Sequence, residues 1–346
     1  MCDRGGNPFM RCLRRFPGWL GWAALALACV PAAHAEESQF AYVYTTDLLP
    51  KGAKEIEQWM TWRHQKIGGY YDQVEGRTEV EYGLTDRLQV ALYGNYAWAR
   101  AYHNGPYGAT TPPEQFADKD VDPDARWSDK RFVGVSAEAI YRVLSPYTDG
   151  VGLAFYVEPT VGPQFKELET KVILQKNFLD DRLTTAFNFT YAPEWRYLAD
   201  DTAAAGKSWQ EETDINFNFA VSYRFAPNWS AGVEFVNERE YNSYRFRNQS
   251  NGGYYFGPTL HYGGKNFFVT ATFLEQLPWA HAHSDTVDGT LVSGRTFDND
   301  FEKYRVRIKM GYYFVGPEQF VFPAVRSYAI AIAGPQRINR AARTRA

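Results

Sequence analysis

Hydrophobic and polar residues alternate along most of the chain between residues 53 and 314. In the segment 302–314, hydrophobic residues occupy every second position from Tyr304 to Phe314, and basic residues occupy several of the positions between them. A period of two is typical of β-strands whose two faces meet different surroundings. The pattern predicts twelve strands, to within about 2–4 residues at each end. They are expected at 53–66, 70–83, 87–100, 131–143, 151–160, 167–178, 182–196, 212–225, 229–241, 252–262, 266–277 and 302–314.

The connections between these segments fall into two sets. One set is short, as at 83–86 and 226–228, whereas the other includes long polar stretches at 101–130, 197–211, 242–251 and 279–301. Short periplasmic turns and long outer loops are typical of transmembrane β-barrels. We therefore predict an all-β fold, a single antiparallel transmembrane β-barrel of about twelve strands with both termini periplasmic. A soluble barrel or sandwich would show the same alternation, so other features must decide.

The composition favours the membrane. Aromatic residues make up 17% of the chain, yet its mean hydropathy is −0.46. No run of 18 apolar residues follows residue 35, which excludes a spanning helix there. A transmembrane barrel reconciles these facts, because alternate residues meet lipid and aromatic residues form belts at both interfaces.

Residues 1–35 are typical of a secretory signal peptide. Arginines precede an apolar stretch at 19–30, and Ala33-His34-Ala35 forms an A-x-A cleavage site before Glu36. All three cysteines of the chain lie within this segment, so the mature part has no disulfide or thiolate metal site. Cys29 weakly resembles a lipoprotein cleavage box. The predicted parts are the signal at 1–35, the barrel at 36–314 and a basic, disordered periplasmic tail at 315–346.

The net charge becomes informative once the chain is divided. The whole chain carries −3, with +3 in residues 1–35 and +4 in residues 315–346, which leaves −10 for residues 36–314. Nucleic-acid binding requires a basic face. A nucleic-acid partner is therefore not expected.

Three segments carry a resemblance. The strand 304–314 resembles the closing β-signal of outer-membrane proteins, residues 81–88 resemble their periplasmic turns, and the opening segment Tyr42 to Gly52 is similar to the start of an uncharacterised proteobacterial outer-membrane barrel family. The resemblance implies location in the cell outer membrane and contact with its lipid, lipopolysaccharide and barrel-assembly machinery. It implies no activity. One departure is that 32 residues follow Phe314, whereas a β-signal normally ends the chain.

Charged residues on the predicted inner face are the candidate functional residues. They are Glu55, Glu57, Arg63, Glu75, Arg77, Glu79, Glu81, Arg305, Arg307 and Lys309. Closure of the barrel is expected to bring the cations of the last strand beside Glu55 and Glu57 of the first, where opposite charges attract. This wall predicts either a constriction with a transverse field, as in diffusion channels, or a packed polar core that conducts nothing.

Other groupings give little sign of chemistry. The run Asp118-x-Asp120-x-Asp122, with Asp124 and Asp129, resembles a calcium loop, but Pro123 replaces its turn glycine, so a solvated acidic loop is expected. His281-Ala-His283 could hold a transition metal only weakly. No G-x-S-x-G or H-E-x-x-H motif occurs. We therefore expect no enzyme, no cofactor and no metal site.

Two functions compete at this point. The charged inner wall favours a passive channel or transporter for small solutes. The alternative is a non-conducting barrel that acts through the long loops 101–130 and 279–301 by binding a surface partner or stabilising lipopolysaccharide. The sequence leaves the oligomeric state open.

Overall fold

The computed structural model describes residues 38–66, 68–199, 207–246, 249–280, 289–292 and 295–314. The predicted signal peptide, the tail after Phe314, Cys29 and the His281-Ala-His283 pair lie outside the described residues.

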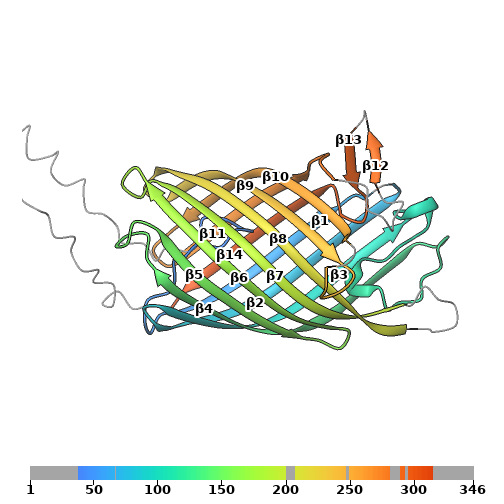
Figure 1. The fold of residues 1–346 in the computed structure, drawn as a ribbon, viewed down its shortest axis with the longest axis horizontal. Coiled ribbons are helices and arrows are strands. Elements are labelled where there is room, and N and C mark those ends of the chain that lie inside the picture. The colour runs from blue at the N-terminus through green and yellow to red at the C-terminus, as the bar shows by residue number, and fades with distance from the viewer. Residues whose placement is uncertain are drawn as a thin grey trace, which may run out of the picture. The chain divides into compact units, whose positions relative to one another are not determined.

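Twelve strands form one closed antiparallel barrel, in the order β1-β14-β11-β10-β9-β8-β7-β6-β5-β4-β3-β2 (Figure 1). This confirms the predicted fold class and strand number. The strands are β1 (Lys54–His64), β2 (Tyr70–Thr85), β3 (Leu88–Tyr102), β4 (Trp127–Leu144), β5 (Gly152–Val161), β6 (Phe165–Phe178), β7 (Leu183–Ala199), β8 (Lys207–Ala226), β9 (Trp229–Tyr241), β10 (Gln249–Gly263), β11 (Phe267–Gln276) and β14 (Tyr304–Tyr313).

The long connections contain structure that the alternation did not predict. Two four-residue strands, β12 (Gly289–Val292) and β13 (Arg295–Asp298), form a hairpin within the expected loop 279–301. The loop after β3 contains the 3-10 helices η1 (Pro106–Gly108) and η2 (Glu114–Phe116). Such elements are too short to show a period in sequence.

No helix within the described ranges has the length and apolar character needed to cross a membrane.

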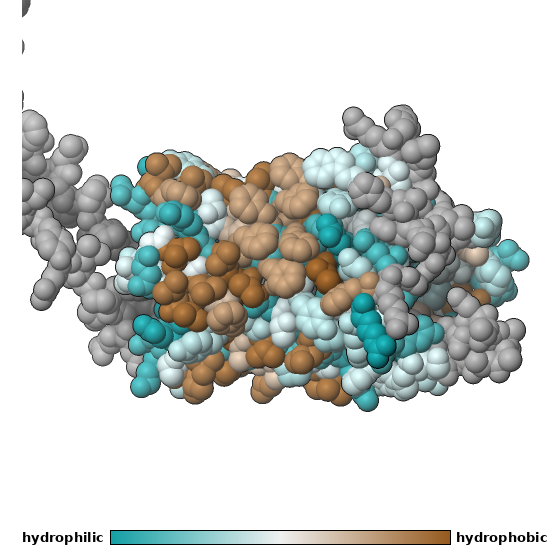
Figure 2. Space-filling view, in the orientation of Figure 1, coloured by the Kyte–Doolittle hydropathy of each residue, from teal (hydrophilic) through white to brown (hydrophobic). Residues whose placement is uncertain are grey.

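The outer face of the barrel carries the hydrophobic half of the alternation. On β1, Ile56, Met60 and Trp62 are exposed, whereas Glu55 and Glu57, the neighbours of Ile56 on either side, are buried. Figure 2 shows hydrophobic side chains around the middle of the visible face and hydrophilic ones toward both ends. A soluble protein would reverse this polarity, and lipid is the surrounding that an apolar belt with polar ends requires.

The two ends of the barrel differ. At one, here called the turn end, short connections such as 86–87 and 227–228 meet the beginning of β1 and the end of β14. At the other, the loop end, lie the connection 103–126 and the β12–β13 hairpin (Figure 1).

The segment 38–52, here called the plug segment, enters the barrel interior from the turn end before β1 begins. Its Phe40, Val43 and Leu49 are buried against inward residues of the wall. This placement could not be predicted from the residues alone, because the segment lacks a strand pattern.

Candidate functional site

The barrel contains a cavity of about 300 Å³ on the loop-end side of the plug segment. Tyr42 and Tyr44 of the plug segment form part of its lining, and Gln115 of η2 reaches it from the loop end. The wall contributes polar side chains from many strands, including Thr61, Arg63, Glu75, Arg77, Asn95, Glu158, Thr160, Glu167, Glu169, Lys171, Thr190, Asn216, Asn218, Glu238 and Arg307.

Glu234 of β9 anchors the plug segment. Its fully buried carboxylate accepts hydrogen bonds from the backbone N–H groups of Ala41 (2.8 Å), Tyr42 (2.8 Å) and Val43 (3.1 Å). The hydroxyl of Thr272 donates a fourth bond at 2.6 Å. Successive N–H groups converging on a carboxylate form charge-assisted hydrogen bonds, about twice as strong as neutral ones.

Side-chain amides continue this pairing toward the turn end. Asn188 accepts from the N–H of Tyr44 at 2.6 Å and donates to its carbonyl at 2.9 Å. Gln175 accepts from the N–H of Thr46, and Gln89 accepts from that of Leu49, both at 2.7 Å. Buried backbone groups need hydrogen-bond partners. These inward side-chain amides supply them, so the plug segment can run through the lumen without pairing to a neighbouring strand.

An alternating stack of cations and aromatic rings joins the plug segment to the wall. The guanidinium of Arg307 lies 3.9 Å from the ring centre of Tyr42 and 5.2 Å from that of Trp59. Arg77 lies 4.8 Å from Trp59 and 4.0 Å from Tyr93. Each contact contributes about 0.5–2 kcal/mol, more where water is excluded. The stack therefore ties four strands to Tyr42.

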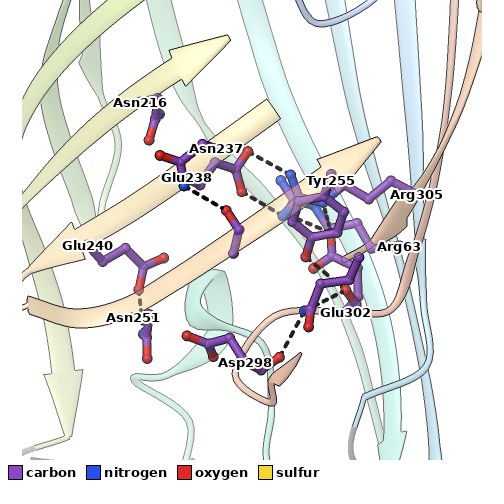
Figure 3. A network of polar contacts seen from close by, with 12 residues as sticks. Arg63, Asn216, Asn237, Glu238, Glu240, Asn251, Tyr255, Asp298, Glu302 and Arg305 are labelled. Atoms are coloured by element: carbon purple, nitrogen blue, oxygen red, sulfur yellow. Dashed lines mark hydrogen bonds and ion pairs between the residues drawn. The ribbon is translucent and has the colours of Figure 1, made fainter. Parts of the chain in front are cut away.

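A second network closes part of the loop end (Figure 3). Arg305 of β14 binds the carboxylate of Glu238 through two bonds of 2.6 Å, pairs with Glu302 and lies 3.8 Å from the ring centre of Tyr255. Arg63 also contacts Glu302, at 3.2 Å. Burial would raise the pKa of the Glu302 carboxyl, but the two guanidinium groups outweigh it and hold the pKa below its usual value. The connection before β14 is thereby held inward.

The loop after β3 also folds over the lumen. Gln115 donates to Glu75 at 2.9 Å, and Glu114 pairs with Arg196 at 2.5 Å. In the acidic run of this loop, Asp118 pairs with Arg131 at 2.6 Å. Asp129 pairs with Lys119 at 3.2 Å. Two of the five acids are therefore bound to cations.

The ten predicted inner-wall residues divide into two groups in the structure. Arg63, Glu75, Arg77 and Arg307 line the cavity. The other six are almost fully buried in the wall, namely Glu55, Glu57, Glu79, Glu81, Arg305 and Lys309.

The predicted pairing across the first-to-last junction is wrong for two of its three cations. Lys309 contacts Glu57 at 3.2 Å, but Arg307 lies opposite Thr61 and Arg305 opposite Arg63. In an antiparallel pair the end of the last strand meets the beginning of the first. Tyr313 therefore lies beside Glu55, and the arginines lie farther along β1.

Charges of both signs face the lumen. Arg307, Arg63 and Arg77 come from β14, β1 and β2, whereas β7 lies six strands from β1 in either direction around the barrel. The wall around β7 is rich in inward acids, which include Glu167, Glu169, Glu194, Glu212 and Asp214. Lys171 and Arg196 pair with acids of this wall, and Arg63 pairs with Glu75 on the opposite wall, so ion pairs occur on both sides of the lumen.

Sequence reasoning missed the residues that hold the plug segment. The alternation of side chains along each strand places Glu234, Asn188 and Gln175 on the inner face, but no sequence pattern predicts which groups they contact. Two of the described histidines have partners in the adjoining strand: His64 contacts Asp72 at 2.7 Å on the outer face, and buried His261 contacts Thr270 at 2.7 Å.

Comparison with solved structures shows the same kind of fold. The chain is similar to the COG4313 outer membrane channel from Pseudomonas putida F1, with a TM-score of 0.51 and 10% identity over 77% of this chain and 97% of that one. The NanC porin matches with a TM-score of 0.43 and 12% identity, over 74% and 98% of the two chains. At such identities the likeness concerns the fold alone.

No curated protein matches this chain significantly. A family model does match, and it spans residues 32–314, which include the plug segment and the whole barrel. The chain therefore belongs to the family of unknown function DUF6662.

Proposed function

We propose that the protein is a passive channel for small solutes in the cell outer membrane, with its turn end in the periplasm. The predicted signal peptide, the closed barrel and the apolar belt support this location, with outer-membrane lipid and lipopolysaccharide around the belt. The observation that carries the channel proposal is the polar cavity of about 300 Å³ inside a closed barrel, lined by charged groups of both signs.

The plug segment narrows the path at the turn end. Phe40, Val43 and Thr46 are almost fully inaccessible to solvent, so a solute in the cavity cannot pass them without displacement of the segment. We therefore expect small or infrequent conductance in the wild-type protein. Passage requires the plug segment to shift, as in barrels whose interior is closed by an internal segment.

Single-channel recording in planar bilayers tests this proposal. The comparison is between the wild-type protein and a variant that lacks residues 38–48, with folding of each checked by heat-modifiable migration on a gel. We expect the deletion to produce larger and more frequent conductance steps. A folded deletion variant that stays sealed at all voltages would overturn the channel proposal.

The burial of the plug segment also favours the second function, a non-conducting barrel that acts through its outer loops. That function predicts that the deletion variant stays sealed. It also predicts that shortening 103–126 weakens binding of a surface partner or the stabilisation of lipopolysaccharide. We expect no catalytic activity under either function, because the sequence lacks a recognisable nucleophile or metalloprotease motif.

A further inference from the structure

Most of the charged side chains that line the cavity are paired with one another or with a neighbour in the wall. The pairs are Arg63 with Glu75 at 3.0 Å, Arg77 with Glu158 at 3.6 Å, Lys171 with Glu169, and Glu238 with Arg305 at 2.6 Å. Two charged residues of the lining remain, Arg307 and Glu167. Within the described part of the chain, neither has an ion-pair partner of opposite charge.

Arg307 and Glu167 project into the cavity from opposite walls of the barrel. Arg307 belongs to β14 and Glu167 to β6, and these strands lie six apart in either direction around the barrel. Both side chains are half-buried, whereas Arg305 and Lys309 of β14 are almost fully buried. The cavity therefore has a cationic pole and an anionic pole that remain open to a ligand.

The cationic pole offers hydrogen-bond donors. The Nε atom of Arg307 donates to the hydroxyl of Thr61 at 2.8 Å, and an Nη atom donates to the carbonyl of Ala41 at 3.2 Å. A guanidinium has five N–H donors, so others remain for a ligand. Tyr42, whose ring lies under this guanidinium, also lines the cavity, and its buried hydroxyl has no hydrogen-bond partner among the described residues. Such a set of donors suits a carboxylate.

The wall around Glu167 offers acceptors. Thr190 of β7 and Asn218 of β8, on the two strands that follow β6, line the same cavity. Thr190 is 1% exposed and Asn218 is 8% exposed, and the hydroxyl of the first and the Oδ1 atom of the second have no hydrogen-bond partner in the described ranges. Buried polar atoms nearly always have a partner, in the protein, in water or in a ligand. An ammonium group, which has three donors, complements these oxygens and the carboxylate of Glu167.

We propose that the cavity binds a small zwitterionic solute, with its carboxylate at Arg307 and Tyr42 and its ammonium group at Glu167. The inference rests on the proposed channel function, because it names the class of solute that passes. A cavity of about 300 Å³ lies at the lower limit of small-molecule sites, which restricts the solute to the size of an amino acid or a short peptide. Because the two poles lie on opposite walls, a dipeptide, with its charges at its two ends, fits better than a single α-amino acid.

Isothermal titration calorimetry on the full mature protein in detergent at pH 7 tests the site. The probes are glycylglycine, N-acetylglycylglycine, which lacks the ammonium group, and glycylglycinamide, which lacks the carboxylate. We expect glycylglycine to bind at least about tenfold more tightly than either analogue, because each analogue leaves one pole without its charged partner. The proposal is overturned if glycylglycine does not bind, or if either analogue binds as tightly.

Two variants separate the poles. Arg307→Gln should weaken binding of glycylglycine and N-acetylglycylglycine about tenfold and leave glycylglycinamide unchanged. Glu167→Gln should weaken glycylglycine and glycylglycinamide and leave N-acetylglycylglycine unchanged. Tyr42→Phe removes only a hydroxyl and should affect the same two probes as Arg307→Gln. Misfolding would weaken all three probes together, and that result in folded variants, checked by heat-modifiable migration, would overturn the proposal.

The matched controls are Arg182→Gln and Glu275→Gln, because both residues are exposed and lie outside the lining of the cavity. Neither change should alter the affinity for any probe. Planar-bilayer recording separates this inference from the channel function. Selective glycylglycine binding by the wild-type protein, together with a sealed variant that lacks residues 38–48, supports the site and overturns the channel. Conductance in that variant, together with equal affinities for the three probes, overturns the zwitterion site and leaves the channel function.

Discussion

Replacing Glu234 with glutamine should release the plug segment from the wall. The carboxylate accepts three backbone N–H bonds, from Ala41, Tyr42 and Val43, and hydrogen bonds to a charged group contribute about 1.5–3 kcal/mol each. A glutamine keeps one acceptor oxygen and turns an NH₂ group toward N–H donors. A loss of two of these bonds therefore costs roughly 3–6 kcal/mol.

That loss acts on the equilibrium between held and released plug segment. Because about 1.4 kcal/mol corresponds to a tenfold change in an equilibrium constant, the released fraction should rise by at least about 100-fold. Planar-bilayer recording should show more frequent conductance steps in Glu234→Gln. Hydrogen exchange at the amides of Ala41, Tyr42 and Val43 should accelerate by the same factor as the released fraction.

Glu275→Gln is the control, because Glu275 is an exposed glutamate on β11, two strands from β9. It should alter neither exchange nor conductance. If exchange at residues 41–43 is unchanged in Glu234→Gln, the carboxylate does not hold the segment. If exchange accelerates while conductance stays at the wild-type level, the plug segment does not control passage.

Two further changes test the loop end. Arg305→Met should destabilise the barrel by about 3–5 kcal/mol, because it leaves Glu238 and Glu302 buried without their shared cation. The variant should therefore unfold at a lower temperature, measured by heat-modifiable migration on a gel. An unfolding temperature equal to that of the wild-type protein would contradict the prediction. Burial raises the pKa of Asp298 in β13 to about 6 from 3.8. The folded state then binds more protons than the unfolded state between these values, so the stability of this connection should fall as pH rises through about 4 to 6. Exchange at the amide of Gly252, which donates to Asp298 at 2.7 Å, should therefore be better protected at pH 4 than at pH 7 after correction for intrinsic rates, and Asp298→Asn should abolish the difference.

The alternation of residue types determined the strands and the direction of each side chain. In 304–314 the basic residues fall on one face and the hydrophobic residues on the other, and the structure buries Arg305 and Lys309 while exposing Ile308 and Met310. This is a local property, because successive side chains of a strand point to opposite faces and the two faces meet lipid and lumen. Eleven residues are enough to display it.

Only the tertiary structure decided which inward residues meet. The register of β1 against β14 brings Arg305 opposite Arg63 rather than beside Glu55, and closure of the barrel sets that register. The plug segment is the stronger case, since Ala41 binds a carboxylate 193 residues away. Its N–H groups satisfy side chains from separate strands, which are brought together only when the barrel closes around the segment. No periodicity along the chain records contacts of that kind, because they depend on the distance across the lumen and not on neighbours in sequence.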